Sequence, residues 1–585
     1  MPSEIIFIFS ISVSLRSLNF LAPTVKIGYD RFGRAVKTET EGFNESVFSV
    51  KTYNEKGLIT SSTPSFGQSG TTVTTTYVYD DFGRINSETN SIGYTTYDYT
   101  PGSTEVTVTN QPSGHFSKKK TDAGGKLITA EDDGGTITYT YFSDGNVKDI
   151  TNGITVATFE YDEYGRQTKL IDANAGTIEY LYNAFGELIS QTDAKGTTAM
   201  EYDVLGRIIT QTGPDGVTVY EYVTSGNGLN QVKKITTPEG NIVSYQYDEL
   251  GRNTAVTETI DGADYTTTYK YDKFSNPIKT TYPSGFSVDR SFNAKGYFTQ
   301  INNSADGKFI WKADAMNSFS QYTEFTLGNN VKTYKTFNEY GLVTDIYAGS
   351  IQSLSLTWNL TTGNLDERKY NLSDLKESFI YDDLSRLTQS TVNGKPSVTL
   401  TYSDNGNIAT KTGLGSYIYK RGAPNAVETI TLTDEIINQD EEGTATHNII
   451  SHNHQDITYT PFNKTKTITE NNYELIIQYG AGNARKVTEL KQSGVVIKKI
   501  IYSGSYEKII IGSDTYEVHY IAGGDGLTAI NVRHNNVDKM YYVYTDHLGS
   551  ILKLTDESGA VIYEQNYDAW GRERNPVDWT YAPNI

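Results

Sequence analysis

The 585-residue chain contains no cysteine. This absence excludes disulfide bonds, thiolate metal sites and cysteine nucleophiles together. Extracellular animal proteins of this length usually carry disulfides, so the composition favours a bacterial source.

Basic charge is also scarce. Fifty Lys and Arg side chains stand against seventy Asp and Glu, which gives a formal net charge of −20. The basic residues are dispersed except for the three lysines at 118–120, which are typical of a solvated turn. The sequence therefore lacks the basic surface by which proteins bind nucleic acid.

Long hydrophobic runs are missing as well. The apolar run at residues 5–15 is too short to span a membrane and predicts no transmembrane segment. It has the length of a signal-peptide core, but Glu4 precedes it, and neither a basic segment nor an A-x-A cleavage site is present. Residues 1–26 are therefore either a signal-like leader or irregular sequence.

The abundant feature is one motif. Tyr-Asp-x-x-Gly-Arg occurs six times, and degenerate copies between them keep the aromatic residue, often Asp or Asn, and usually Gly. Tyr141, Tyr161, Tyr182 and Tyr202 open successive copies at steps of 20, 21 and 20 residues. A period near twenty is the length of one small supersecondary unit. The full copies occupy residues 29–34, 79–84, 161–166, 202–207, 247–252 and 567–572.

Each copy predicts a hairpin tip, which we call a motif turn. Asp at the first position and Gly at the fourth favour a type I turn followed by a G1 bulge, as at Asp162 and Gly165. A second set of turns lies halfway between the motif turns, and we call these the halfway turns. Examples occupy residues 172–176, 193–196, 214–216, 238–240, 283–285 and 556–559.

Between the turns, residues alternate with the two-residue period of a strand, so that Ile178, Tyr180 and Tyr182 share one face. The sequence therefore predicts an all-β fold, a long antiparallel meander of short strands without long helices. The 45 tyrosines either form cross-strand ladders or supply an aromatic surface for glycans, and their periodicity favours the ladders. The motif Arg has no explanation at this level.

These repeats resemble the YD or RHS repeats of bacterial RHS proteins and of teneurins, from about Ile27 onward. The C-terminal part resembles the RHS-repeat-associated core. The residues that carry this second resemblance lie at 459–464, 521–527, 544–550, 554–556, 559 and 567–572.

The resemblance implies that the hairpins spiral into a hollow, β-barrel-like shell, with domains at 27–420 for the repeat shell and 421–585 for the core region. An acidic insertion near 434–456 interrupts the core region. In bacterial members such a shell encloses a C-terminal polypeptide, typically a toxin, released by self-cleavage at the end of the core. The family's Asp-Pro-containing core end is missing before Ile585, so a gene fragment or a shell without cargo is expected.

The resemblance thus implies a secreted or cell-surface structural protein that is not an enzyme. Its expected partner is an encapsulated polypeptide or toxin domain outside this chain. We carry over no catalytic, cofactor-binding or metal-binding residue. A surface module that recognises glycans or a partner-cell protein is the alternative, and a carbohydrate-active enzyme is a third hypothesis.

Two polar clusters are candidate sites. His452 and His454, with Asn453 and Asp456 nearby, could ligate Zn²⁺ from one face of a strand, but they follow an acidic segment typical of an exposed loop. Asp546, His547 and Ser550 place a carboxylate, an imidazole and a hydroxyl within five residues. Neighbours on a strand point to opposite faces, so a structural hairpin is favoured over a catalytic triad.

Overall fold

The computed structural model describes residues 9–13, 23–67, 72–432 and 456–581. These residues form β-strands and turns, and the only helical segment among them is a single 3-10 turn, η2 (Ala481–Asn483). The predicted all-β fold is confirmed. Within each sheet, every strand pairs antiparallel with the next along the chain, which is the expected meander.

The first sheet contains 39 strands. Its first half comprises β1 (Phe9–Val13), β2 (Val25–Tyr29), β3 (Ala35–Glu41), β4 (Ser46–Tyr53), β5 (Ile59–Phe66), β6 (Thr75–Tyr79), β7 (Ile85–Thr89), β8 (Tyr94–Tyr99), β9 (Glu105–Gln111), β10 (Phe116–Thr121), β11 (Leu127–Asp132), β12 (Gly135–Tyr141), β13 (Val147–Thr151), β14 (Val156–Tyr161), β15 (Gln167–Asp172), β16 (Gly176–Tyr182), β17 (Leu188–Asp193), β18 (Gly196–Tyr202), β19 (Ile208–Gly213) and β20 (Gly216–Tyr222).

The sheet continues through β21 (Val232–Thr236), β22 (Ile242–Tyr247), β23 (Asn253–Ile260), β24 (Ala263–Tyr271), β25 (Pro277–Thr281), β26 (Ser287–Phe292), β27 (Phe298–Asn303), β28 (Phe309–Met316), β29 (Tyr322–Leu327), β30 (Lys332–Phe337), β31 (Val343–Ala348), β32 (Gln352–Trp358), β33 (Leu365–Tyr370), β34 (Leu375–Tyr381), β35 (Leu387–Val392), β36 (Val398–Tyr402), β37 (Ile408–Lys411), β38 (Gly415–Lys420) and β39 (Ala423–Leu432).

A second sheet of 11 strands and a final two-stranded pair complete the described chain. They comprise β40 (Asp456–Tyr459), β41 (Thr465–Glu470), β42 (Tyr473–Tyr479), β43 (Arg485–Gln492), β44 (Val495–Ser503), β45 (Tyr506–Ile511), β46 (Asp514–Gly523), β47 (Gly526–His534), β48 (Val537–Thr545), β49 (Ile551–Thr555), β50 (Val561–Glu564), β51 (Asn566–Tyr567) and β52 (Glu573–Arg574).

The motif turns have the predicted geometry. At one of them, the Asp162 carboxylate Oδ1 accepts the N–H groups of Tyr164 and Arg166 at 2.9 and 3.0 Å. The Gly165 N–H donates to the Asp162 carbonyl at 3.0 Å, and Gly165 has a φ of 77°. A register shift between Glu160 and Tyr161 marks the expected bulge.

The motif Arg joins one hairpin to the next. Arg166 Nε donates to Asp162 Oδ2 at 2.6 Å, and its guanidinium lies 4.9 Å from the ring centroid of Tyr182, which opens the following copy. Arg166 Nη1 also donates to the Asn183 carbonyl at 3.0 Å. The Arg therefore combines an ion pair within its own turn with a cation–π contact to the next. The same stacking occurs for Arg34 on Tyr53, Arg84 on Tyr99, Arg207 on Tyr222, Arg252 on Tyr271 and Arg386 on Tyr402.

The motif Tyr contacts the preceding hairpin, whereas the motif Arg contacts the following one. The Tyr182 hydroxyl donates to the backbone carbonyl of Gln167 in the preceding hairpin at 2.9 Å. The ladder interpretation therefore covers only part of its role, since the hydroxyl also satisfies a backbone acceptor of the neighbouring hairpin. The same bond is made by Tyr53, Tyr79, Tyr99, Tyr141, Tyr202, Tyr222, Tyr247, Tyr271, Tyr381 and Tyr402.

Substitution of the turn glycine tests this construction. Gly165→Val is expected to lower the free energy of unfolding by about 1 to 2 kcal/mol, because a β-branched residue is strained at positive φ. Glu163→Ala in the same turn should change it by less than about 0.5 kcal/mol, because this side chain is exposed. Urea-denaturation midpoints of the two variants give the comparison, and equal losses would contradict the assigned turn.

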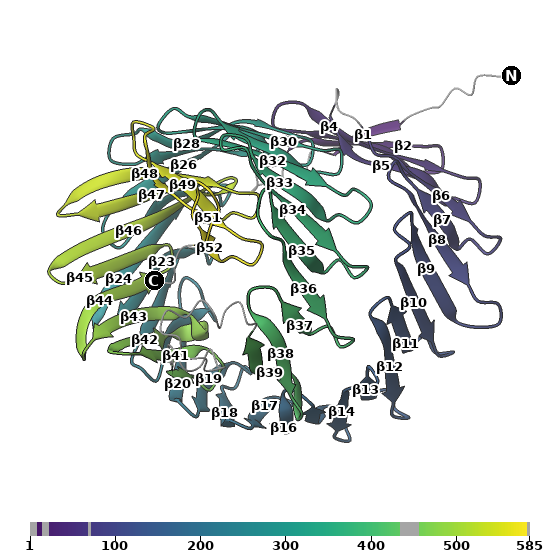
Figure 1. Cartoon of the computed structure of the whole chain (residues 1–585), viewed down its shortest axis with the longest axis horizontal. Coiled ribbons are helices and arrows are strands. Elements are labelled where there is room, and N and C mark those ends of the chain that lie inside the picture. Colours follow the sequence, from purple (N-terminus) through teal and green to yellow (C-terminus); the bar gives the residue numbers. More distant parts are fainter. Residues whose placement is uncertain (1–8, 14–22, 68–71, 433–455, 582–585) are drawn as a thin grey trace.

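The sheet curves until it runs alongside itself (Figure 1). Within the described strands, β1 pairs only with β2 and β39 only with β38, so the first sheet is a spiral and does not close into a hydrogen-bonded barrel. Successive layers touch through turns that are 249 to 268 residues apart. These contacts join Ser91 Oγ to Tyr340 Oη at 2.6 Å, Lys295 Nζ to the Gly42 carbonyl at 2.8 Å, and Lys195 to Asn463.

Each of these contacts follows one rule. Ser91, Gly42 and Lys195 lie in halfway turns, whereas their partners lie in motif turns later in the chain. The motif turns of each later layer therefore rest on the halfway turns of the layer before it.

The largest apolar core lies where the second sheet packs on the first. Trp311 on β28 is fully buried, and its ring stacks on Phe298 at 5.1 Å. The core continues into the second sheet through Ile521 and Ala529, which are also fully buried. A long-range ion pair between Lys486 and Glu258 lies beside this core.

Candidate functional site

A buried ionic cluster lies where the C-terminal residues meet β33 and β34. Arg368 and Glu377 are cross-strand partners, and Glu377 has no exposed surface. Arg368 donates to Glu377 Oε2 from Nε at 2.9 Å and from Nη2 at 2.6 Å. Arg574 on β52 donates to the same carboxylate, from Nη2 to Oε2 at 2.8 Å and from Nη1 to Oε1 at 3.2 Å. We call Arg368, Glu377 and Arg574 the C-terminal cluster.

Backbone and aromatic groups complete the cluster. The Tyr567 carbonyl accepts from Nη2 of Arg368 at 2.5 Å and from Nη2 of Arg574 at 2.8 Å. Ser390 donates to Glu377, and the ring of the buried Trp579 lies 4.8 Å from the Arg574 guanidinium. The contacts hold the C-terminal residues 566–579 against strands that precede them by about 200 residues, as the 197-residue separation of Glu377 and Arg574 illustrates.

The electrostatics favour the charged forms of Glu377 and Arg368. Burial acts to raise the pKa of Glu377, but the charges of Arg368 and Arg574 and their hydrogen bonds outweigh it and leave the pKa below its ordinary value. Burial likewise acts to lower the pKa of Arg368, and the Glu377 carboxylate reverses this direction. The cluster is thus a paired and hydrogen-bonded buried charge group.

The last full motif copy, at 567–572, lies next to this cluster. Asp568 Oδ1 accepts the N–H groups of Trp570 and Arg572 at 2.8 Å, as in the other motif turns. The Arg572 guanidinium stacks 4.1 Å from the ring of Tyr581, and the Tyr581 hydroxyl donates to Asp568 Oδ2 at 3.1 Å. Burial and the Asp568 carboxylate raise the pKa of Tyr581 to about 12. Tyr581 therefore takes the place that the next motif Tyr has elsewhere.

The candidate residues named from the sequence are not brought together as a catalytic set. Asp546 Oδ1 accepts the N–H groups of Leu548 and Ser550, both at 2.9 Å, as in a motif turn. The His547 ring packs edge-on against Trp358 at 6.1 Å, and burial lowers its pKa. His452, Asn453 and His454 lie outside the described residues, and Asp456 begins β40.

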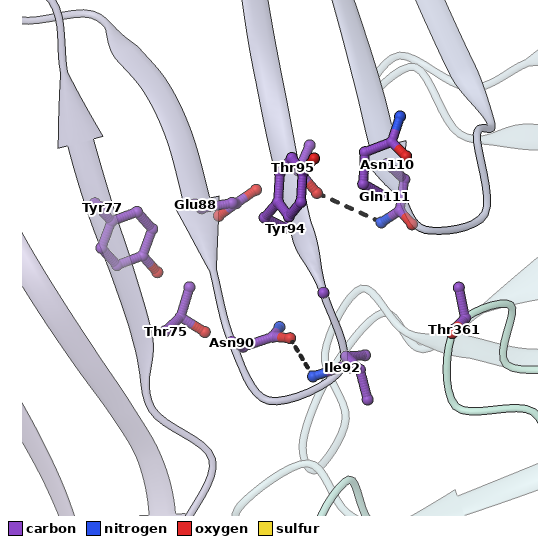
Figure 2. A pocket seen from close by; sticks show the side chains of 11 residues that line it. Thr75, Tyr77, Glu88, Asn90, Ile92, Tyr94, Thr95, Asn110, Gln111 and Thr361 are labelled. Atoms are coloured by element: carbon purple, nitrogen blue, oxygen red, sulfur yellow. Dashed lines mark hydrogen bonds between the residues drawn. The ribbon is translucent and has the colours of Figure 1, made fainter.

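A polar pocket of about 230 Å³ lies on β6 to β9, near Thr361 of a later layer (Figure 2). The strand register aligns four of its side chains across neighbouring strands. They are Tyr77, Glu88, Thr95 and Asn110. Glu88 accepts a hydrogen bond from the Tyr97 hydroxyl at 2.5 Å. The pocket offers hydroxyl, amide and carboxylate groups to a polar ligand.

Sequence reasoning missed the C-terminal cluster. Glu377 shares the two-residue period with Phe379 and Tyr381, so the sequence places a carboxylate on the face that is aromatic elsewhere on this strand. The Glu377 carboxylate on this otherwise aromatic face was the feature of the sequence from which the cluster could have been predicted. Its partners Arg368 and Arg574 carry no such mark.

Comparisons place this architecture among known proteins. The family model described as Teneurin YD-shell matches residues 158–258 and 197–578. The solved TcdB2-TccC3-Cdc42 structure superposes with a TM-score of 0.77 at 14% identity, covering 96% of this chain and 35% of that chain. A Photorhabdus luminescens Tc holotoxin pore carrying the TccC3 mutation D651A gives 0.75 at 14% identity, covering 94% of this chain and 34% of that chain.

The chain thus spans about a third of the length of the solved structures it matches. No curated protein sequence matches it. Among the described residues, no helix is long and apolar enough to cross a membrane.

Proposed function

The chain belongs to the teneurin YD-shell family, and from that membership we propose that it is the structural β-shell of an exported bacterial RHS-type protein that encases or presents a C-terminal polypeptide. The encased or presented polypeptide would be of the kind that is typically a toxin. The repeats themselves would perform no catalysis. Residues 27–420 are the repeat shell and residues 421–585 the core region. The protein acts outside the cell or at its surface.

The self-overlapping spiral is the observation that carries this proposal. A wall whose layers rest on one another through matched turns surrounds a space as it winds, whereas a flat sheet would not (Figure 1). Both solved structures described above include TccC3 in their names. One of those names describes a Tc holotoxin pore with a mutation in TccC3. Those names support a toxin-type partner for a shell of this kind.

Protease protection tests the encasing function. An unstructured polypeptide fused after Ile585 should resist trypsin, because the wall would exclude the protease from it. The matched control carries the same polypeptide on an unrelated β-sandwich, where it should be cut. Equal cleavage rates in the two fusions would leave a shell that presents its polypeptide and would refute encasement.

Recognition of glycans is the second candidate, and the polar pocket on β6 to β9 favours it. Carboxylate and amide groups beside aromatic rings suit the hydroxyl groups of a sugar. Saturation-transfer NMR with galactose and N-acetylglucosamine should then detect contacts that Glu88→Ala removes and that Glu163→Ala, in a distant turn, leaves unchanged. Absence of transfer to either sugar would eliminate this pocket as their site.

A further inference from the structure

One halfway turn of the first sheet is fastened to the second sheet. It spans residues 282–286, between β25 and β26, and the strands β46 and β47 lie against it. Three side-chain hydrogen bonds cross from one sheet to the other here. They join Ser284 Oγ to His519 Nε2 at 2.6 Å, the Tyr282 hydroxyl to the Tyr520 carbonyl at 3.2 Å, and Arg533 Nη1 to the Ser284 carbonyl at 2.7 Å. We call this contact the histidine joint.

His519 is enclosed within the joint. It has no exposed surface, and three aromatic rings lie with their centroids 5.0 to 5.5 Å from that of the imidazole. They belong to Tyr282, Phe286 and Tyr506. Burial raises the pKa of both tyrosines, so they stay uncharged. The ring is therefore surrounded by neutral groups on the side of the first sheet.

The hydrogen bonds assign the proton of the neutral imidazole. The Asn531 carbonyl on β47 lies 3.1 Å from Nδ1 of His519 and can only accept, so Nδ1 carries the proton. Nε2 is then an acceptor, and Ser284 donates its hydroxyl hydrogen to it. A second proton on the ring would reverse this bond, because Nε2–H would have to donate and the Ser284 hydroxyl hydrogen would lose its acceptor.

Charged groups of both signs lie near His519. Glu517 on the same strand and Asp538 on β48 favour the charged ring, whereas Arg533 opposes it. Both carboxylates are engaged elsewhere, since Glu517 accepts from the Tyr506 hydroxyl at 2.7 Å and Asp538 accepts from Arg533 at 2.9 Å. Burial outweighs them and holds the His519 pKa below its ordinary value of 6.5.

We propose that the histidine joint is an acid-sensitive fastening, in which protonation of His519 in a mildly acid medium releases the 282–286 turn from β46 and β47. A histidine freed into water takes up its proton near pH 6.5, whereas the enclosed one resists it. The joint is therefore at full strength above pH 6.5 and weakens as the pH falls toward the lowered pKa. Because one proton is bound, its opening constant rises by at most about tenfold per pH unit.

The joint is a property of the contact between the two sheets, whether or not the shell encloses a polypeptide. It also differs in pH range from the C-terminal cluster, where the stabilising charge of Glu377 is lost only below pH 4.5. The interval between the two ranges isolates the histidine.

Hydrogen exchange of the full chain, followed by mass spectrometry between about pH 7.5 and about pH 5, tests the joint. After correction for intrinsic exchange rates, protection of residues 282–286 should fall with pH, by up to about tenfold per unit. Protection of residues 176–202, which form β16 to β18, should stay unchanged.

Three variants identify the group responsible. His519→Gln keeps a polar side chain that cannot titrate, so protection of the turn should no longer depend on pH. Ser284→Ala removes the hydroxyl, so its turn should be less protected than that of the wild type near neutral pH and similar to it in acid, where the bond is already lost. The control His547→Gln, at the buried histidine beside Trp358, should leave the pH dependence of the turn unchanged.

Far-UV circular dichroism establishes that the variants are folded. Turn protection that does not change with pH in the wild-type chain overturns the proposal, and so does an undiminished pH dependence in His519→Gln. Should His519→Gln fail to fold, Ser284→Ala decides, because a deficit in protection that is equal at neutral and acid pH also overturns it.

Discussion

Replacement of Glu377 by Ala is expected to lower the free energy of unfolding by about 3 to 5 kcal/mol, because it leaves two buried guanidiniums without a counter-charge. Local protection from hydrogen exchange should fall most in the segment that carries Arg574. Hydrogen exchange at residues 566–579 should therefore rise more than exchange in the first sheet. Chemical denaturation measures the first effect and exchange mass spectrometry the second.

A matched control lies one strand away. Glu367 pairs with Lys376 at 2.5 Å, but both side chains are partly exposed, so Glu367→Ala should cost no more than about 1 kcal/mol. Unchanged protection of residues 566–579 in the Glu377→Ala variant would refute the cluster as the attachment of the C-terminal residues.

Acid should remove the same contribution. The Glu377 pKa is lowered in the folded protein from an ordinary value of 4.5, so its stabilising effect is complete above pH 4.5 and disappears as the pH falls through the lowered value. The stability difference between the wild-type chain and Glu377→Gln should therefore shrink below pH 4.5. A difference that stays constant down to strongly acid pH would contradict a charged Glu377.

Trp311→Ala should have a comparably large effect on global stability, a loss of about 3 to 5 kcal/mol. Its ring is buried between Phe298 and Tyr322, with centroids 5.1 and 5.2 Å away, and contributes to the core shared with the second sheet. Truncation leaves a cavity at this joint, and thermal unfolding followed by far-UV circular dichroism reports the loss.

Phe82→Ala is the contrasting substitution for Trp311→Ala. The Phe82 ring is exposed in a motif turn, so its removal should change stability by less than about 0.5 kcal/mol. If Trp311→Ala lowered the free energy of unfolding as little as Phe82→Ala, the joint between the sheets would contribute little to folding.

Local chemistry made much of the fold predictable. Asp162 and Gly165 specify their turn through hydrogen bonds and a positive φ within five residues, and the alternation around Tyr180 specifies a strand. These features depend only on neighbours in the sequence. The predicted antiparallel meander results from them.

Contacts between different hairpins, and between segments that meet only because the sheet curves, were not predictable from local sequence. Arg166 remained unexplained because its aromatic partner belongs to the next hairpin, and the orientation that stacks it on Tyr182 requires the hairpins to be paired first. The C-terminal cluster is further removed, since Glu377 and Arg574 meet only after the sheet has wound back on itself. The sequence motif carries no information on how many hairpins complete one layer.

The alternation of motif turns and halfway turns restricts how such a chain can lengthen. An extra single strand between Ser91 and Tyr340 would exchange the two kinds of turn at every later contact and oppose like with like. An extra whole hairpin would keep the kinds matched and merely move each contact to a neighbouring pair. Growth by gene duplication is therefore tolerated in whole-hairpin steps, which agrees with the 20- and 21-residue intervals between Tyr141, Tyr161 and Tyr182.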